Sequence, residues 1–354
     1  MPGARAARDP GPDARKPGPV SVLATNLELS AAFMPNERTA PLLSGRVQPE
    51  GITLLTTPLH ASEMFWRQLK FAEFDISEMS MSSLVIATAN GPTDWVALPI
   101  FSMRQFFHTS VLVRAGAGIE KPADLRGKRI GVPEYQQTWA VWSRGIFADE
   151  FGVQPKDNVW YMERTPEHSH GGATGFTAPP GVELHYIPKT TNIGEMMVAG
   201  ELDATLLYLT SANLIDRSRI DLHARTDMRT LFPDPAAEAQ RYYAKTGMFP
   251  INHTVVVRRS LLEKHPWVAL NIYEAFVRGK ELIRQERNAR LEPYLATGLL
   301  DSAASAALGR DPMPYGVVAA RRELETIARY DYEQGLAKRL VGLDELFAPA
   351  TLAL

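Results

Sequence analysis

Two residues that can do chemistry, Arg104 and His108, stand four positions apart, just ahead of the apolar run 111–114. A guanidinium can hold a carboxylate with two hydrogen bonds, which fixes the orientation of the carboxylate as well as its charge. A histidine titrates near neutral pH and can serve as an acid or a base. The pair also fits a structural role, in which Arg104 forms a salt bridge and His108 is a hydrogen-bonded core residue. Both interpretations stay open at this point.

Glu134 and Tyr135 follow another apolar run, and Gln136 and Thr138 come directly after them. Positions that follow a strand in an α/β sheet often face the ligand, because such sheets bind ligands at the carboxyl ends of their strands. The stretch 104–142 therefore predicts charged, titratable and aromatic groups on both sides of a crossover between two lobes, which is what a cleft needs.

Three hydroxyl-rich segments occur where a strand should end and a helix should begin: Ser80–Ser83, Thr190–Asn192 and Thr210–Ser211. A helix N-terminus leaves backbone N–H groups unpaired and carries a partial positive charge, so it favours carboxylates and other anions. Each segment alone is explained as an ordinary helix N-cap. Several of them converging on one cleft would form an anion site.

Two further groups of polar residues come later in the chain. Asn252 and His253 precede an apolar run and are expected near the second crossover between the lobes. The turn-rich insert 163–181 contains His168 and His170 and begins at a glutamate, Glu163. Its length is typical of a lid, a binding loop or a disordered segment. His-x-His can ligate a metal, but a metal site needs three or four agreeing ligands, so a solvated loop is the favoured interpretation.

Strand and helix patterns alternate along the chain, which indicates an α/β fold with mostly parallel sheets. Short apolar runs predict strands, and apolar residues at helical spacing predict helices. The C-terminal third, from residue 260 onward, has mostly helical patterns. The expected strands are 19–23, 51–55, 74–79, 95–100, 109–114, 129–132, 204–208 and 255–258, and the expected helices are 62–71, 82–89, 136–151, 192–200 and 267–284.

The totals of the sequence bound the class of protein. Its 354 residues suffice for two lobes with separate cores, and 45% hydrophobic with 22% charged residues is ordinary for a globular protein. The formal net charge of −2 gives no electrostatic case for nucleic acid or an anionic membrane as a partner. There is no cysteine, which excludes disulfides, thiolate metal sites and a cysteine nucleophile.

The N-terminal segment is rich in Pro, Gly, Ala and Arg, and it lacks the apolar stretch that a secretory signal needs. We therefore expect a disordered tail over residues 1–18 and a cytoplasmic protein. No run approaches the roughly 18 apolar residues of a membrane span. The sequence contains no Gly-rich phosphate loop, no Gly-x-Ser-x-Gly motif and no His-Glu-x-x-His motif.

Four segments of the chain resemble the 4,5-dihydroxyphthalate decarboxylase family. They are 104–108 (Arg-Gln-Phe-Phe-His), 122–136 (from Pro-Ala-Asp-Leu-Arg-Gly-Lys to Glu-Tyr-Gln), 249–253 (Phe-Pro-Ile-Asn-His) and 309–316 (Gly-Arg-Asp-Pro-Met-Pro-Tyr-Gly). Type 2 periplasmic solute-binding proteins also share the Pro-Ala-Asp-Leu-Arg-Gly-Lys part, so the other segments are the more specific ones. The resemblance extends over residues 20–340.

The resemblance implies a two-lobed, type 2 periplasmic-binding-protein-like fold that serves as a cytoplasmic enzyme. Lobe I would comprise residues 19–114 and 249–354, with a helical C-terminal extension, and lobe II residues 115–248. The family reaction is the non-oxidative loss of CO2 from 4,5-dihydroxyphthalate, which gives protocatechuate and needs no organic cofactor. A homo-oligomer is expected, with the helical C-terminal third as a plausible interface. The insert 163–181 departs from the family pattern in length and histidine content, which puts the lid and the exact substrate in question.

The resemblance also suggests roles for individual residues. Arg104 would hold the carboxylate that stays on the ring, and His108 or His253 would transfer protons. Glu134 would orient a histidine or donate a proton with a raised pKa. A divalent metal on Glu134, His108 and His253 is compatible with the sequence, although the spacing does not demand one. The residues expected to bind and position the aromatic carboxylate are Arg104, Ser80, Ser82, Tyr135, Gln136, Thr138, Thr191, Tyr208 and Asn252.

A non-catalytic binding protein for an aromatic or other carboxylate is the competing hypothesis. Such a protein would have the same fold and the same cleft, and the motifs at the lobe crossover do not separate the two. The missing signal segment favours the enzyme.

Overall fold

The computed structural model describes residue 3 and residues 26–354, so the expected strand 19–23 and all but one residue of the expected tail lie outside the described residues. The first of its two β-sheets has five strands in the order β2-β1-β3-β11-β4. Strand β11 is antiparallel to β3 and β4, and β1 is parallel to β2 and β3. The strands are β1 (Leu27–Phe33), β2 (Ile52–Pro58), β3 (Ile76–Ser80), β4 (Trp95–Arg104) and β11 (Ile251–Arg258).

The second sheet has six strands in the order β10-β5-β9-β6-β7-β8. Strands β6 to β9 pair in parallel, whereas β5 is antiparallel to both β9 and β10. The expectation of mostly parallel sheets is therefore confirmed, with β11 and β5 as the reversed strands. The strands are β5 (Leu112–Arg114), β6 (Arg129–Val132), β7 (Val159–Met162), β8 (Glu183–Tyr186), β9 (Ala204–Thr205) and β10 (Met228–Thr230).

The chain crosses between the sheets twice, between β4 and β5 and again between β10 and β11. The expected lobe I boundary at residue 114 is too late, because β5 pairs within the second sheet. Part of the predicted strand 109–114 instead belongs to a short 3-10 helix, η1 (Phe107–Ser110), so the first crossover lies ahead of residue 112. The expected return to lobe I near residue 249 agrees with the start of β11.

Helices pack the two sheets into one body, and C-terminal residues join the lobes. Helix α11 contacts both α3 and α4, and a single core cluster contains buried residues of both sheets and of α11. Elements near the cavity described below are α2 (Ala61–Phe71), α3 (Met81–Asn90) and α4 (Thr138–Phe151). The others are α1 (Ala40–Leu43), α5 (Gly171–Thr174), α6 (Ile193–Ala199), α7 (Pro235–Thr246), α8 (Arg259–Lys264), α9 (Val268–Ala296), α10 (Ser302–Leu308), α11 (Val317–Glu333) and α12 (Leu343–Leu346), with short 3-10 turns η2 (Pro122–Leu125), η3 (Pro155–Asp157) and η4 (Pro349–Thr351).

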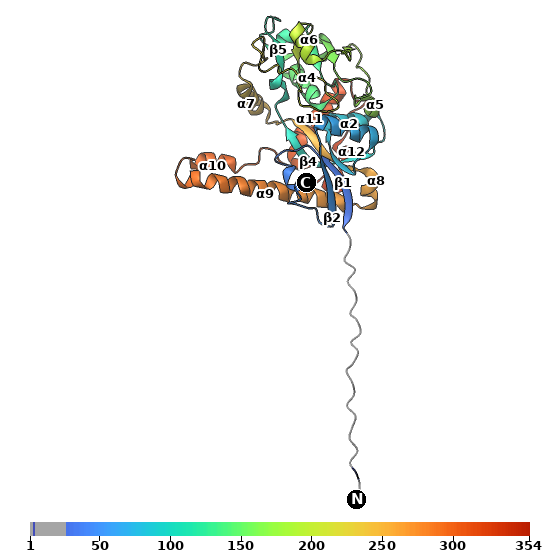
Figure 1. The fold of residues 1–354 in the computed structure, drawn as a ribbon, viewed down its shortest axis with the longest axis vertical. Coiled ribbons are helices and arrows are strands. Elements are labelled where there is room, and N and C mark those ends of the chain that lie inside the picture. Colours follow the sequence, from blue (N-terminus) through green and yellow to red (C-terminus); the bar gives the residue numbers. More distant parts are fainter. Residues whose placement is uncertain (1–2, 4–25) are drawn as a thin grey trace.

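Most elements with a strong pattern occur close to the predicted residues. Helix α6 lies between the predicted N-cap Asn192, which accepts the N–H of Glu195 at 3.0 Å, and Gly200, which adopts the left-handed conformation (φ 76°) typical of a helix end. Strands β1, β7, β8 and β10 were not predicted, and α9 extends well beyond residue 284 (Figure 1). In the part of the chain that the structure describes, no helix is both long and apolar enough to cross a bilayer.

Candidate active site

A cavity lies where ends of strands from both sheets meet. Its empty space, with the open mouth included, is about 560 Å³. Ligands of open α/β sheets bind at this carboxyl edge. The wall combines apolar side chains with a few polar groups, and it is formed by Met34, His60, Ala61, Ser62, Phe65, Ser80, Met103, Gln137, Thr138, Trp139, Arg164, His170, Leu207, Leu209, Asn252 and His253.

Three helices begin at the cavity wall. The wall includes residues 60–62 at the start of α2, Ser80 at the start of α3, and residues 137–139 at the start of α4. The Thr138 hydroxyl lies 2.8 Å from the Ser80 hydroxyl and accepts the Ser82 N–H at 3.0 Å, which ties α3 to α4. Each of the three helix starts places a partial positive charge at the cavity, although the N–H groups of Ser62 and Ser82 are already paired within the protein. The site therefore favours an anion.

His253 is held on the cavity wall by a buried carboxylate. Its Nδ1 lies 3.0 Å from Oε2 of Glu78, a residue of β3 that is fully buried. Glu78 also accepts the Met34 N–H at 2.7 Å and the Ser102 hydroxyl. The side-chain amide nitrogen of Asn252 lies 3.0 Å from the other ring nitrogen, Nε2. A histidine with a carboxylate on Nδ1 has its ring orientation and its tautomer fixed, which suits proton transfer at Nε2.

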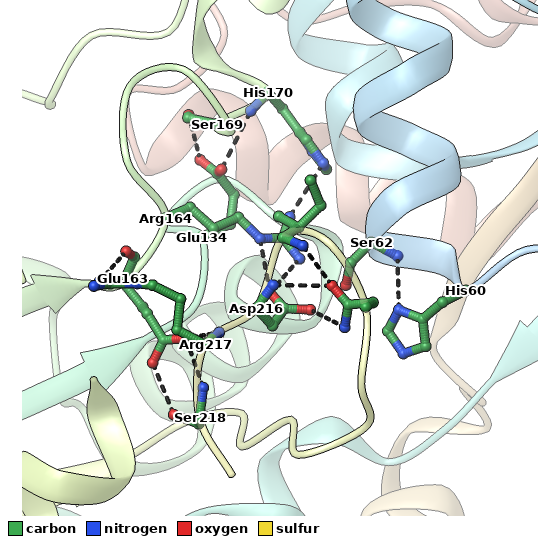
Figure 2. A network of polar contacts seen from close by, with 12 residues as sticks. His60, Ser62, Glu134, Glu163, Arg164, Ser169, His170, Asp216, Arg217 and Ser218 are labelled. Carbon is green, nitrogen blue, oxygen red and sulfur yellow. Dashed lines mark hydrogen bonds and ion pairs between the residues drawn. The ribbon is translucent and has the colours of Figure 1, made fainter. Parts of the chain in front are cut away.

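Arg164 lies on the same wall between a carboxylate and an imidazole (Figure 2). Its guanidinium pairs with Asp216 at 3.0 Å and donates to Nε2 of His170 at 3.2 Å. Arginine has only N–H donors, so Nε2 of His170 is an acceptor, and its Nδ1–H is left to donate to the Ser83 hydroxyl 3.1 Å away. Burial, followed by the charge of Arg164, lowers the pKa of His170 to about 3. His170 is therefore neutral, with both ring nitrogens in use.

A third imidazole, His60, stands at the start of α2. Its Nδ1 accepts the N–H of Ser62 at 3.3 Å, which leaves the proton of the neutral ring on Nε2. Burial lowers the pKa of His60, and the nearby Arg164 adds to that effect while Asp216 opposes it. His60 therefore presents a neutral N–H donor at the cavity wall.

Glu134 is buried next to the cavity wall rather than on it. Its carboxylate accepts the Ser169 hydroxyl at 3.0 Å and the backbone N–H of His170 at 3.2 Å (Figure 2). Burial raises the pKa of Glu134. The raised pKa agrees with the sequence-based expectation, but Glu134 holds the backbone of His170 rather than an imidazole ring.

Three other expected substrate contacts lie behind the wall. The ring of Tyr135 is fully buried, with the guanidinium carbon of Arg144 3.8 Å from its centre. Gln136 accepts the Thr174 hydroxyl at 2.7 Å. Ser82 reaches Thr138 only through its backbone N–H, and its own side chain is fully buried. The positions of these residues after the end of a strand were predicted correctly. Their side chains, however, point into the packed interior of the lobe and do not line the cavity.

Thr191 and Tyr208 also lie outside the set of residues that line the cavity. The helix that follows Thr191 offers its first N–H, of Ile193, to the carboxylate of Glu163 at 2.8 Å, so this helix start is already paired with an anion. Tyr208 donates its hydroxyl hydrogen to the carbonyl of Ile220 at 2.7 Å. The third hydroxyl-rich segment, 210–211, begins no helix.

Arg104 and His108, the pair with which the sequence argument began, are buried at the crossovers and away from the cavity wall. Arg104 pairs with Glu323 of α11 at 3.0 Å and donates to two backbone carbonyls, those of residues 249 and 314. His108 pairs with Glu238 of α7 at 3.1 Å. The structure therefore places these two side chains in structural pairs, and the cation at the cavity is Arg164.

The insert 163–181 is not a solvated loop at its chemically important positions. Glu163, Arg164 and His170 are each at most 3% exposed, because their polar atoms are paired inside the protein. Exposure is confined to other parts of the insert, such as Glu167. Within residues 26–354, no three His, Asp or Glu side chains come together in a way that could hold one metal ion, and His108, Glu134 and His253 have separate partners.

Four residues of the site were not among the sequence-based candidates: His60, Glu78, Arg164 and Asp216. His60 stands just ahead of the predicted helix 62–71. Glu78 belongs to the predicted strand 74–79 and lies two positions before Ser80, so the two side chains point to the same face of the sheet. Those two signals were available. Arg164 follows β7, a strand that was not predicted, and Asp216 lies in an irregular segment without any local pattern.

Comparison with known proteins gives the family. A 4,5-dihydroxyphthalate decarboxylase from Comamonas testosteroni is 33% identical over 333 residues, which are 93% of this chain and 98% of the relative. A 4,5-dihydroxyphthalate decarboxylase from Pseudomonas putida is 36% identical over 185 residues, which are 52% of this chain and 72% of the relative. No family model matches the chain.

Among solved structures, the alkanesulfonate-binding protein SsuA from Xanthomonas axonopodis pv. citri, bound to MOPS, superposes with a TM-score of 0.53. The match covers 92% of this chain and 97% of that protein at 15% sequence identity, so it shows the fold alone. The two-lobed, periplasmic-binding-protein-like fold is thereby confirmed. The sequence match to the Comamonas testosteroni relative covers nearly the whole length of both chains. The chain is therefore an enzyme of the 4,5-dihydroxyphthalate decarboxylase family.

Proposed function

We propose that the cavity binds 4,5-dihydroxyphthalate and releases CO2 from it without oxidation, which gives protocatechuate. The observation that carries the proposal is the juxtaposition of three helix starts and Arg164 with a carboxylate-bound histidine, His253, around one small-molecule cavity. Anion binding and proton transfer are the two tasks of such a decarboxylase. The relatives' activity supports the choice of substrate.

The substrate carries two adjacent carboxylates, and the cavity offers two kinds of partner for them. Arg164 supplies a guanidinium that is oriented by Asp216, and the starts of α2, α3 and α4 supply partial positive charge. Because Asp216 already balances Arg164, a dianion would depend on the helix starts and on a proton at His253.

Among the three imidazoles on the wall, His253 is the one suited to hold and release a proton. His170 uses both ring nitrogens in contacts to Arg164 and Ser83, and protonation would place a second cation against the guanidinium. His60 uses Nδ1 to accept a backbone N–H, so that its protonation would break this bond. His253 also has both ring nitrogens in contact, Nδ1 with Glu78 and Nε2 with the Asn252 side-chain amide, but its partner on Nδ1 is a carboxylate, so protonation at Nε2 costs the Asn252 contact and gives an ion pair with Glu78.

The proposed chemistry balances without an organic cofactor. A base removes the proton of the hydroxyl para to the departing carboxylate, and electron density moves onto the ring carbon that bears this carboxylate. An acid then adds a proton to that carbon. The bond to the carboxylate breaks, CO2 leaves, the ring regains its aromatic state, and the phenolate recovers a proton. One proton is consumed for each CO2 released.

His253 would provide one of the two proton transfers, and His60 would donate its N–H to a substrate oxygen. The ring of Phe65 contacts the edge of His253, with 4.8 Å between ring centres, and so limits both the water around the imidazole and its rotation. Positioned acid–base groups contribute about 10²–10⁴-fold to a rate.

The test is turnover by the purified full-length chain. We expect protocatechuate and CO2 to form from 4,5-dihydroxyphthalate in equal amounts, with one proton taken up per CO2. Treatment with a chelator should leave the rate unchanged, since each proposed step uses side chains of this chain. Tight binding of hydroxylated phthalates without any product would contradict the proposal and support the non-catalytic binding protein.

A further inference from the structure

Gln137 is a residue of the cavity wall that has no part in the chemistry proposed above. It stands at the start of α4, directly after Gln136, whose side chain bonds Thr174 behind the wall. The backbone of Gln137 is engaged, because its N–H donates to the carbonyl of Glu134 at 3.3 Å and its carbonyl accepts the N–H of Val141 at 3.1 Å. The backbone is therefore fixed, and the side chain is left to serve a ligand.

The side-chain amide of Gln137 opens onto the cavity. Among residues 26–354 it has no hydrogen-bond partner, although Gln137 is only 8% exposed. Other wall residues are paired, as the hydroxyls of Ser80 and Thr138 are with each other. Neither amide atom of Gln137 is sealed inside the packing, whereas the indole nitrogen of the adjacent Trp139 is. Because a nearly buried amide is unfavourable without a partner, its place on the wall points to a polar group of the ligand.

A short series of contacts relates Gln137 to the histidine proposed to transfer protons. The hydroxyl of the next residue, Thr138, lies 2.8 Å from that of Ser80. Ser80 is the register partner of His253 between β3 and β11, and the Cβ atoms of such partners are about 4.5–5.5 Å apart. The amide of Gln137 and the imidazole of His253 therefore face the same part of the cavity.

The chemistry of a carboxamide indicates which part of a ligand it takes. Gln137 presents an acceptor, Oε1, and a donor, the Nε2–H group, side by side. Two neighbouring ring hydroxyls match this pair, because one can donate to Oε1 while the oxygen of the other accepts from Nε2. A carboxylate has only acceptors, so one of its oxygens would lie against Oε1 without a hydrogen bond. The guanidinium of Arg164 is the partner suited to a carboxylate.

We propose that Gln137 is a specificity-determining residue that holds the two adjacent hydroxyls of the substrate ring. This inference rests on the proposed function, since it takes the substrate of that reaction as the ligand. With the hydroxyls at Gln137, one of them lies beside His253. Its O–H bond breaks, the proton moves to Nε2 of His253 in place of the contact with Asn252, and the electron pair stays on the phenolate oxygen. The Nε2–H group of Gln137 then stabilises this oxygen.

Isothermal titration calorimetry of the full chain with three benzoates tests the contact. Protocatechuate has both hydroxyls, whereas 3-hydroxybenzoate and 4-hydroxybenzoate each lack one. Wild type should bind protocatechuate about 5- to 100-fold more tightly than either, because a missing hydroxyl leaves one end of the Gln137 amide without a partner. Gln137→Met removes both polar ends at similar length and should abolish this preference. Wild type that shows no preference, or a folded Gln137→Met variant that keeps it, would overturn the proposal.

Gln105→Met is the matched control for the calorimetry. Gln105 lies outside the cavity, and its amide bonds the hydroxyl of Ser110. This variant should keep the preference of wild type for protocatechuate. Circular dichroism checks the fold of each variant. Loss of the preference in Gln105→Met as well would show that the effect does not belong to Gln137 and would overturn the proposal.

A second variant, Gln137→Glu, keeps the shape of the side chain and tests the contact with the phenolate. It retains an acceptor for the hydroxyls but puts a negative charge beside the forming phenolate. We expect kcat for 4,5-dihydroxyphthalate to fall by about 10²–10³-fold, as for the loss of one oxyanion donor, with a smaller change in KM. The loss should grow as the pH rises and the new carboxylate ionises. A wild-type kcat in this variant would contradict the contact.

The role of Gln137 and the proposed reaction fail in different measurements. A chain that shows the Gln137-dependent preference but forms no protocatechuate from 4,5-dihydroxyphthalate contradicts the decarboxylation and supports the contact. Turnover of 4,5-dihydroxyphthalate together with an unchanged preference in Gln137→Met overturns the contact and leaves the decarboxylation in place.

Discussion

The cavity and the crossovers contain the same two kinds of buried pair. At the cavity, Arg164 pairs with Asp216 at 3.0 Å and His253 with Glu78 at 3.0 Å. At the crossovers, an arginine, Arg104, pairs with Glu323 at 3.0 Å, and a histidine, His108, pairs with Glu238 at 3.1 Å. The types of side chain, the distances between the paired atoms and the burial of the side chains barely differ between the two regions. The difference is that Arg164 and His253 line a cavity and the crossover side chains do not.

This contrast shows that the type of a residue and its access to a cavity are two separate requirements for a role in function. The crossover pairs connect β4 to α11 and η1 to α7, so they fix the segments in which the chain crosses between the sheets. The cavity pairs leave one face of an imidazole and of a guanidinium next to a space that a ligand can enter. We therefore expect cavity variants to change turnover and crossover variants to change stability.

The largest effect is expected from breaking the histidine pair at the cavity. Glu78→Gln should lower kcat by up to the full contribution of the acid–base group, about 10²–10⁴-fold, because the imidazolium of His253 loses its stabilising charge. In a His253→Gln background, Glu78→Gln should have little further effect, since Glu78 acts through His253. Steady-state kinetics of this double-mutant cycle checks the coupling, and the pH profile of kcat should shift in Glu78→Gln. Additive losses would show that Glu78 acts independently.

At the crossover, the matched change should lower stability instead. Arg104→Met leaves Glu323 buried without its partner, and breaking such a pair costs about 3–5 kcal/mol. The double variant Arg104→Met/Glu323→Leu removes both charges and should recover most of the loss. Urea unfolding measures the free energy, and kcat of the folded protein should change little. A large loss of kcat in Arg104→Met at full folding would mean that this arginine serves the reaction after all.

A smaller effect is expected at the cavity arginine. Arg164→Lys keeps the positive charge but loses the planar guanidinium, whose paired N–H groups can hold a carboxylate with two hydrogen bonds. One charge-assisted hydrogen bond to the substrate should therefore be lost. Such bonds contribute about 1.5–3 kcal/mol, so KM should rise by roughly 10–100-fold with a smaller change in kcat. As the matched control at the crossover, Arg104→Lys should leave KM unchanged. Equal KM values for both lysine variants would remove the distinction between the two arginines.

The smallest effect concerns the pH dependence of stability. Burial lowers the pKa of His170 to about 3, whereas an unfolded histidine has a pKa near 6.5. Between these values the unfolded chain binds one more proton, so the stability from neutral His170 is complete above about pH 6.5 and is lost as the pH falls toward about 3. His170→Gln should reduce the slope of unfolding free energy against pH in this window by at most about 1.4 kcal/mol per pH unit. An identical slope in both proteins would contradict a buried neutral imidazole.

Elements with a strong local pattern could be predicted from the sequence. Strand β6 has the predicted bounds 129–132, and the helix start after Ser80 was predicted together with its role in facing the cleft. Strand β1 has small and polar residues (Leu-Glu-Leu-Ser-Ala-Ala-Phe) and gives only a weak strand pattern, although its pairing with β2 and β3 fixes it in the sheet.

The site pairs could not be predicted, because they join residues that are far apart in the chain. Glu78 and His253 are separated by 175 positions, and Arg164 and Asp216 by 52. Spacing drew attention to Arg104 and His108 because they are close together, but both side chains turn into the lobe interior toward partners more than a hundred positions away. Only the fold decides which charged side chains reach a cavity.

The most direct measurement compares two histidine variants of the full chain side by side. His253→Gln and His108→Gln each remove one buried imidazole that pairs with a glutamate, and each keeps a side chain of similar size. With 4,5-dihydroxyphthalate as substrate, we predict that His253→Gln lowers kcat by about 10²–10⁴-fold and that His108→Gln leaves kcat within a few-fold of wild type. Loss of turnover in His108→Gln with full activity in His253→Gln would contradict the assignment of the cavity as the active site.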